Sequence, residues 1–494
     1  MSKRYLPILN VPVNSSQNDR TFRHRRFRLI NGLLWLFAAA PSDALAQHPV
    51  RASAEVGAFG SSSGHTPFWL RSNQYGIVPV EVTPATLRVG LLVDYDSLRL
   101  FTHRLTYGGG LTGVGNAGSR SGVLVQEAYE KVRSGIFELY AGRRREYVGL
   151  ADSTLSTGSY AWSGNALPVP KLHLEIRSFT PIGLTKGFVA VKGSFANGWL
   201  GGRYVQHSLL HQKSLYVRLG KPGSRLKVYV GLNHQVVWGG RSEDLLKTGL
   251  VKNAQLPSRF RDYLSLVSGL RATGSGITDS TAYTDFDLTN RVGNHLGSVD
   301  VALELATNQF TYYLYRQNPY ETGALFYGTR LADGLNGLRI RSTNPRAVVQ
   351  QVVVEYLNVT NQGGNEFIIG DPKRRGRVNY FNHSQYRDGW SYYGEPIGTP
   401  FIPSISNLRG KLPYGAFTND NRVQVWHVGI AGNLSARPHR YLAGPVTFRS
   451  NLSYSRNLGT YNEPFGQPIH QFSGVATVLV PRCWCRSPGC GVSS

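Results

Sequence analysis

The chain has 494 residues and a formal net charge of +25. Hydrophobic residues make up 41% and the mean hydropathy is −0.24, which excludes a bundle of membrane-spanning helices. A net charge this positive suggests a nucleic-acid partner. However, Lys and Arg are spread along the whole chain, and the sequence has no helix-turn-helix, zinc-finger or RNA-binding signature. We expect no nucleic-acid partner. An acidic partner outside the cytoplasm fits better, such as lipopolysaccharide phosphates or an anionic polysaccharide, with a solvated basic surface as the alternative.

The first 46 residues have the order of a secretory signal peptide. A basic stretch at residues 23–28 precedes an apolar run at 33–40, and residues 44–46 form an A-x-A cleavage site. This order predicts residues 1–46 as a signal peptide and Gln47 as the first mature residue. The alternative is a buried helix, because the apolar run is too short to span a bilayer.

After residue 50 the main pattern is alternation of apolar and polar residues with a period of two, which places each apolar set on one face of a strand. The clearest stretches lie at residues 171–177, 214–219, 225–232, 299–306 and 446–454. A soluble sandwich and a transmembrane barrel both fit alternation alone, and a propeller would need a fixed repeat that is missing. The signal peptide, 56 Gly and 27 Tyr favour the barrel. We therefore predict an all-β, antiparallel outer-membrane β-barrel over residues 47–475.

Residues 225–232 allow a prediction for individual side chains. In residues 225–232 the apolar side chains should face lipid and the polar ones the lumen. The lipid-facing set is Leu226, Val228, Val230 and Leu232, and the lumen-facing set is Arg225, Lys227 and Tyr229.

Two long intervals without clear alternation, near residues 239–297 and 361–421, predict long loops or lumen inserts. Residues 476–494 form an atypical tail that contains all three Cys of the chain. The body thus does not depend on disulfides. We expect that a frameshift or truncation has replaced the final strands, and the alternative is a native polar tail.

The group of polar residues that best suits a binding site is the basic cluster Arg143, Arg144 and Arg145. Arg143 and Arg145 should share one face of the strand and Arg144 the other. Because a charge that faces lipid is costly, the cluster should lie near a rim, or Arg144 should point inside with its partners beyond the membrane zone. The functional interpretation is a clamp for an anionic sugar or phosphate. The alternative is an internal Arg–carboxylate ladder.

Aromatic residues follow basic residues at two places, and aromatic faces with nearby donors suit sugar rings. Interfacial girdles or loop packing are the alternative. The candidate glycan-binding residues are Arg143, Arg144, Arg145, Tyr160, Trp162, Arg374, Arg375, Arg377, Trp390 and Tyr392.

We expect no catalysis, metal or cofactor. The G-x-S-x-G run at residues 60–64 has no following helix, as a nucleophile elbow requires, and the His residues are scattered.

Four segments carry a resemblance to a known family. They read HTPFWLRSNQYGIVP (65–79), ELYAGRRREYVGLADSTLSTGSYAWSGNALPVPK (138–171), LLHQKSLYVRLGKP (209–222) and GLNHQVVWGGRS (231–242). The chain resembles the capsule assembly Wzi family of Bacteroidetes-type outer membranes from about residue 52 to 472. The resemblance implies a barrel of roughly 18 antiparallel strands in the cell outer membrane. It also implies a lectin-like, non-catalytic role in attaching or organising capsular polysaccharide or exopolysaccharide.

Two other function classes stay open. An outer-membrane porin or transporter for sugars or other small solutes would need an unobstructed lumen, and a hydrolase would need a Ser or carboxylate constellation that converges in space. The expected partners are capsular polysaccharide or exopolysaccharide, lipopolysaccharide and outer-membrane lipid, and we expect a monomer.

Overall fold

The structure is a computed structural model, and it describes residues 50–481 apart from 83, 101–102, 119–120, 250, 252, 270–282, 285–286, 288–290, 322–330, 369–375, 409–415 and 436–443. Residues Arg51–Ser494 form one compact unit, and the fold belongs to it. The predicted signal peptide, Arg374, Arg375 and residues 482–494 of the tail lie outside the described residues.

The architecture is a single 16-stranded sheet in which the strands follow one another in chain order, from β1 at one end of the order to β18 at the other. Its strands are β1 (Val50–Ala58), β2 (Ala85–Leu100), β3 (His103–Ala117), β4 (Gly122–Ser134), β5 (Phe137–Arg143), β6 (Lys171–Pro181), β7 (Val189–Trp199), β8 (Leu209–Leu219), β9 (Leu226–Trp238), β10 (Asn294–Ala306), β11 (Phe310–Tyr320), β12 (Gly334–Ser342), β13 (Val349–Asn358), β16 (Val423–Ser435), β17 (Val446–Gly459) and β18 (Pro464–Leu479). A separate two-stranded hairpin joins β14 (Ser391–Tyr392) to β15 (Glu395–Pro396). The helices are α2 (Phe68–Arg71), α3 (Glu243–Lys247) and α4 (Phe260–Ser268), and the 3-10 turns are η2 (Gly183–Thr185) and η4 (Ile405–Asn407).

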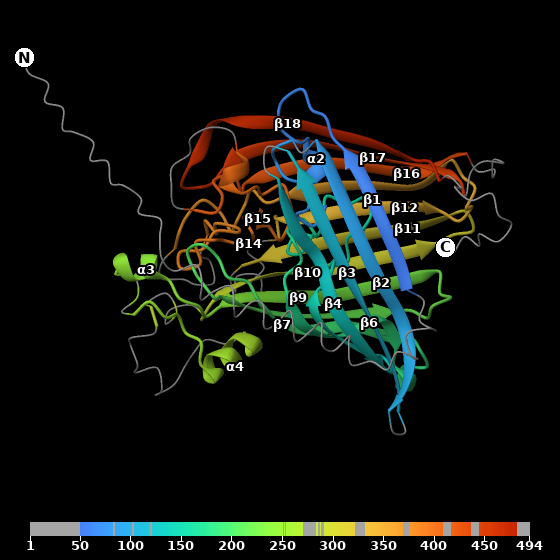
Figure 1. Ribbon diagram of the computed structural model, residues 1–494, viewed down its shortest axis with the longest axis horizontal. Coiled ribbons are helices and arrows are strands. Elements are labelled where there is room, and N and C mark those ends of the chain that lie inside the picture. Colours follow the sequence, from blue (N-terminus) through green and yellow to red (C-terminus); the bar gives the residue numbers. More distant parts are fainter. Residues whose placement is uncertain are drawn as a thin grey trace, which may run out of the picture. The chain divides into compact units, whose positions relative to one another are not determined.

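Connections differ between the two ends of the strands. Strand pairs such as β4–β5 and β10–β11 are joined by short turns at residues 135–136 and 307–309, whereas β5–β6, β9–β10 and β13–β16 are joined by long segments. Because neighbouring strands are antiparallel, all long segments gather at one end, which we call the loop end, opposite the turn end (Figure 1). Outer-membrane barrels combine long loops on one side with short turns on the other.

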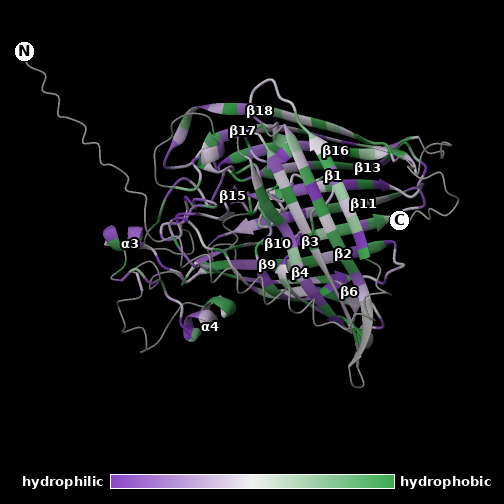
Figure 2. Cartoon of the chain, in the orientation of Figure 1, coloured by the Kyte–Doolittle hydropathy of each residue, from purple (hydrophilic) through white to green (hydrophobic). Residues whose placement is uncertain are grey.

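The two faces of the sheet have opposite polarity, as the alternation in β9 predicts. Leu226, Val230 and Leu232 are exposed on the outer face with 53%, 45% and 44% of their surface accessible, whereas Tyr229 is buried inside. Lys227 also points inward and forms an ion pair with Glu304 of β10 at 2.7 Å. Figure 2 shows the resulting alternation of hydrophobic and hydrophilic bands along the strands. An apolar exterior around a polar interior is the pattern of a transmembrane barrel.

The fold class predicted from the sequence is therefore confirmed: an antiparallel β-barrel of the outer-membrane type. Over the described residues its sheet has 16 strands, compared with the roughly 18 that the resemblance implies. None of the described helices is long and apolar enough to cross a membrane.

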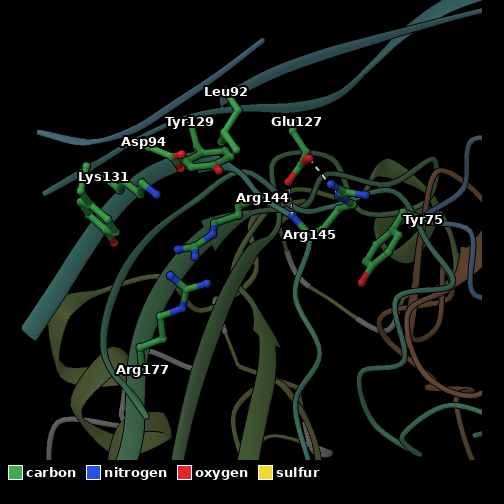
Figure 3. Close-up of a pocket in the computed structure, with 10 residues that line it drawn as sticks. Tyr75, Leu92, Asp94, Glu127, Tyr129, Lys131, Arg144, Arg145 and Arg177 are labelled. Atoms are coloured by element: carbon green, nitrogen blue, oxygen red, sulfur yellow. Dashed lines mark hydrogen bonds and ion pairs between the residues drawn. The ribbon is translucent and has the colours of Figure 1, made fainter. Parts of the chain in front are cut away.

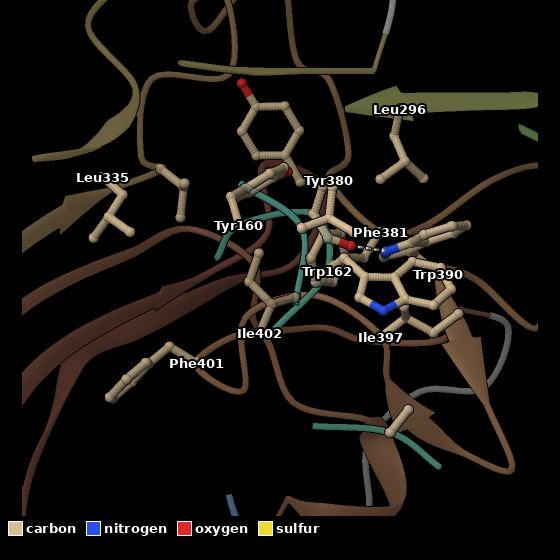
Figure 4. Packing of buried hydrophobic residues seen from close by; sticks show 14 of the residues in the cluster. Tyr160, Trp162, Leu296, Leu335, Tyr380, Phe381, Trp390, Ile397, Phe401 and Ile402 are labelled. Carbon is tan, nitrogen blue, oxygen red and sulfur yellow. Dashed lines mark hydrogen bonds between the residues drawn. The ribbon is translucent and has the colours of Figure 1, made fainter. Parts of the chain in front are cut away.

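The lumen is filled by two irregular segments from the loop end, residues 146–170 and 378–404, which we call the plug. Residues 159–169 are almost entirely buried, and Tyr380, Phe381 and Trp390 have no accessible surface. Figure 4 shows these aromatic side chains packed together with Ile397 and Ile402. Part of the predicted 361–421 loop is thus a lumen insert, and residues 146–170 form a second insert that alternation alone did not indicate.

Candidate functional site

Carboxylates on the inner wall hold the first plug segment by its backbone. Glu355 of β13 accepts hydrogen bonds from the Thr157 N–H and the Ser156 hydroxyl, both at 2.6 Å. Asp300 of β10 accepts one from the Leu150 N–H at 2.9 Å. Buried N–H groups outside regular structure need such partners, because an unsatisfied one costs about 1–3 kcal/mol. The plug is therefore anchored to two separate strands of the wall.

A third carboxylate connects the two plug segments. Glu321 accepts a hydrogen bond from the Tyr160 hydroxyl and one from the Phe381 N–H, each at 3.0 Å. Trp390 adds a direct link, since its indole Nε1–H donates to the Ala161 carbonyl at 2.7 Å. The two segments thus form one packed body.

This packing determines what three predicted site residues can do. Tyr160 and Trp390 have no accessible surface and Trp162 has 5%. The rings of Trp162 and Trp390 lie 6.0 Å apart, and those of Tyr160 and Phe381 lie 5.3 Å apart. All three aromatic side chains are in the arrangement that the loop-packing alternative predicts, and none of them offers a face to a surface ligand.

The strand that carries the basic cluster ends at Arg143, so Arg144 and Arg145 do not alternate along it as expected. Gly142 has φ +120°, and a Cβ there would clash with the carbonyl oxygen of Ala128 on β4. This conformation favours glycine. Beyond it the chain leaves the sheet and turns into the lumen.

Arg144 and Arg145 form ion pairs inside the barrel, as the ladder alternative predicts. Arg144 lies 2.6 Å from Glu138 and 3.5 Å from Glu175, and the Arg145 Nε lies 2.9 Å from Glu127. They line a lumen pocket of about 510 Å³ between strands β2, β4 and β6 and the connection that holds Tyr75 (Figure 3). The other lining residues are Tyr75, Leu92, Asp94, Tyr95, Glu127, Tyr129, Lys131 and Arg177. Cations outnumber carboxylates in this lining.

Glu146, where the plug begins, ties that segment to β6. It forms ion pairs with Lys171 and with His173, the latter at 3.0 Å. Burial acts to raise the pKa of Glu146, but the charges and hydrogen bonds of Lys171 and His173 outweigh it and hold the pKa well below its usual range. The carboxylate is therefore ionised at neutral pH.

Arg143 lies at the loop end and meets the second plug segment. Its Nη2 donates to the Tyr392 hydroxyl at 2.7 Å, and its guanidinium lies 5.6 and 5.7 Å from the ring centres of Tyr392 and Tyr393. Arg143 also donates to the Val125 carbonyl at 3.4 Å. Because both acceptors are neutral, neither cancels the charge. We call Arg143, Tyr392 and Tyr393 the rim patch.

Tyr393 presents the exposed aromatic face of the rim patch. It sits at the tip of the β14–β15 hairpin with φ +52°, followed by Gly394 with φ +81°, and 72% of its surface is accessible. Positive φ at two successive residues is typical of a type I′ turn. Tyr392 beside it is buried, which raises its pKa to about 12 and keeps its hydroxyl neutral, despite the opposing charge of Arg143. Tyr393 is one of the aromatic residues that follow the second basic stretch, but it is not among the candidate residues of the sequence analysis. Gly394, directly after it, is the local signal for the turn.

Arg377 lies elsewhere. It donates to the Tyr461 carbonyl at 3.2 Å, and Arg377 and Arg422 both lie against the Tyr461 ring, at 5.8 and 3.9 Å. The structure thus brings Arg143 and Tyr392 together, but not Arg377. Within the described ranges, no group of three or more His, Cys, Asp or Glu is placed to hold a metal ion.

Fold and site together define an outer-membrane-type β-barrel with a packed lumen and a basic, aromatic patch at its loop end. No family model and no curated protein matches the chain. Among solved structures it is similar to Wzi, an outer membrane protein involved in group 1 capsule assembly in Escherichia coli, described as a carbohydrate-binding β-barrel. The identity is 13%, with 87% of this chain and 83% of that chain covered, and the TM-score is 0.44.

A porin and another outer membrane protein are also similar in structure. The anion-selective porin from Comamonas acidovorans has 11% identity and a TM-score of 0.34, covering 81% of this chain and 90% of that chain. OprD from Pseudomonas aeruginosa has 10% identity and a TM-score of 0.33, covering 80% and 88%. At identities this low, the likeness concerns the fold alone.

Proposed function

We propose that this protein resides in the outer membrane and holds an acidic capsular polysaccharide or exopolysaccharide at the cell surface, without catalysis. The observation that carries the proposal is the rim patch, where Arg143, whose two hydrogen-bond acceptors are neutral, lies beside an exposed tyrosine ring. Acidic sugars offer a carboxylate for the guanidinium and an apolar ring face for the aromatic side chain. The net charge of +25 adds long-range attraction for a polyanion.

The plug supports a binding role, because a binding protein needs no open path. Its two segments pack against each other, and the first is hydrogen-bonded to wall residues of β10 and β13. In such a barrel, rigid elements position the surface groups that bind the polymer.

A porin or transporter for sugars or other small solutes is the second candidate, and the lumen pocket of about 510 Å³ favours it. The two candidates differ in conductance. Purified protein in a planar bilayer should show no steady open-channel current if it is a binding protein. Sustained conductance in the unmodified protein would favour the porin.

The binding test is a pull-down with an acidic polysaccharide across a salt series. Arg143→Gln should weaken binding and reduce its salt dependence, since exposed charges are screened beyond about 8 Å at physiological ionic strength. Tyr393→Ala should weaken binding with little change in salt dependence, because stacking carries no net charge. Matched controls at the turn end are Lys221→Gln and Phe188→Ala, both of exposed residues.

The cellular test is the partition of polymer between cells and medium. Without the protein, the cell-bound fraction should fall and the released fraction should rise, while total polymer stays constant. An unchanged partition would refute retention, and equal binding by the rim variants and the controls would remove the rim patch from the proposal.

A further inference from the structure

Helix α4, in the long β9–β10 connection, lies on the outer face of the sheet rather than in the lumen. On β8, Leu210 and Tyr216 belong to the lumen-side core, so His211 and Lys213 point outward. The Tyr263 ring of α4 lies 5.7 Å from the His211 ring, and Lys213 Nζ donates to the carbonyl of Val267 near the end of α4. Leu266 of α4 packs with outward residues of β9 in a second apolar cluster that is separate from the lumen.

The contact covers polar groups that lipid could not satisfy. His211, Lys213, His234 and His295 are outward-facing residues of three adjacent strands, and His234 and His295 contact each other at 2.9 Å. A charged side chain facing lipid at the bilayer midplane costs about 2–4 kcal/mol. The helix therefore shields His211 and Lys213, which form one side of a polar band on the loop-end part of the outer wall.

The strand register places the edge of this band at one level. Lys213 pairs with His234, and the next outward pair toward the turn end is Leu215 with Leu232. Leu215 is 53% exposed and Leu232 44% exposed. The shielded polar band therefore ends where the exposed apolar band begins, which sets α4 at the loop-end boundary of the membrane-facing surface (Figure 1).

The side of α4 that faces away from the barrel is amphipathic. Phe260 and Leu264, one helical turn apart, are 74% and 53% exposed. Arg259 and Arg261 flank Phe260 and are exposed, although Arg261 also lies 4.0 Å from the buried Asp262. Apolar side chains beside arginines are typical of helices that lie in a membrane interface.

We propose that α4 is a membrane-surface anchor that binds the anionic lipid around the barrel. Phe260 and Leu264 enter the boundary between headgroups and acyl chains, and Arg259 and Arg261 contact lipid phosphates. Two observations select lipid over a second copy of this chain or a soluble partner. The α4 surface is continuous with the lipid-facing band, and its exposed cations complement phosphate groups.

The insertion test uses an environment-sensitive fluorophore on single cysteines, in full-length protein whose Cys483, Cys485 and Cys490 are replaced by Ser. The labelled variants are Phe260→Cys, Val230→Cys as the lipid-facing control and Tyr393→Cys as the water-facing control. In vesicles with brominated acyl chains, the labels at 230 and 260 should be quenched and the label at 393 should not. Quenching at 230 establishes insertion, so a label at 260 that behaves like the label at 393 would overturn the proposal.

The charge test compares vesicles of neutral phospholipid with vesicles that contain lipopolysaccharide or phosphatidylglycerol. Quenching at 260 should be stronger with either anionic lipid. Arg259→Gln and Arg261→Gln should each lower the anionic-lipid preference about fivefold. Lys221→Gln at the turn end is the matched control. Equal quenching at 260 in all lipids would show no lipid selectivity and contradict the proposal. A label at 260 that is shielded from water only as the protein concentration rises would indicate contact between two copies of the chain instead.

Discussion

Trp390 donates its indole N–H to the carbonyl of Ala161 at 2.7 Å, and this bond joins two plug segments that are 229 residues apart in the chain. Trp390 has no accessible surface and lies beside Trp162. The bond and the packing around it hold the two plug segments together.

Replacing this residue, Trp390→Ala, should leave a cavity and an unpaired carbonyl in the plug. The expected loss of stability is about 3–5 kcal/mol, as for other buried aromatic truncations. Thermal unfolding in detergent measures the loss, and bilayer recordings should show new transient current through the loosened plug. Tyr393→Ala, which removes an exposed ring, serves as the control and should change neither measurement. If the two variants were equally stable, the packing role of Trp390 would be refuted.

The variant Glu355→Ala removes the wall acceptor of the Thr157 N–H and the Ser156 and Tyr315 hydroxyls. Each of these three buried donors then loses an acceptor, which costs about 1–3 kcal/mol of stability per donor. We expect lower thermal stability and faster proteolysis within residues 146–170. Glu243→Gln on α3 changes an exposed carboxylate and should have no such effect. Proteolysis at the unmodified rate would mean that the plug does not depend on this wall contact.

The outer face of β9 is predicted to contact acyl chains. Val230→Arg should reduce the free energy of folding into vesicles by about 2–4 kcal/mol if the position is near the midplane. Val230→Ile keeps the residue apolar and should cost little. Urea titrations in lipid vesicles give both values, and equal tolerance of Arg and Ile would contradict a lipid-facing position.

Stability should depend on pH through Asp420, which precedes β16. Burial raises the pKa of Asp420 to about 7, although a hydrogen bond from the Gly459 N–H opposes the shift. The unfolded chain titrates near 3.9, so the folded state holds the extra proton between about pH 4 and 7. The contribution of Asp420 to stability should therefore fall as pH rises through this window and stay level above it.

The total change is about 4 kcal/mol at most, from 1.36 kcal/mol for each pKa unit. Asp420→Asn should remove this contribution, so the variant should gain stability relative to the parent from pH 4 to 7 and be more stable than the parent at pH 8. Asp244→Asn on α3 is the exposed control. Melting temperatures of the parent and of both variants from pH 4 to 9 test the sign. A stability difference between Asp420→Asn and the parent that does not grow from pH 4 to 7 would contradict it.

The strands were largely predictable because their signal is local. In β9 the alternation of Leu226, Val230 and Leu232 with Tyr229 follows from the backbone period of two. The prediction of a membrane barrel then determined that the apolar face of each strand points to lipid and the polar face to the lumen. The candidate site was less predictable: Trp390 and Tyr393 are aromatic residues three positions apart, yet one is fully buried and the other is 72% exposed.

The sequence by itself determined an all-β chain with two-faced strands, a basic charge and aromatic segments outside the alternation. Only the tertiary structure decided which of those segments fill the lumen and which reach the surface, because that depends on partners far apart in the chain. Arg143 meets Tyr392 across 249 positions, and the Thr157 N–H meets Glu355 across 198. Such pairings arise when the sheet curls and buried polar groups must find acceptors, which no local pattern records.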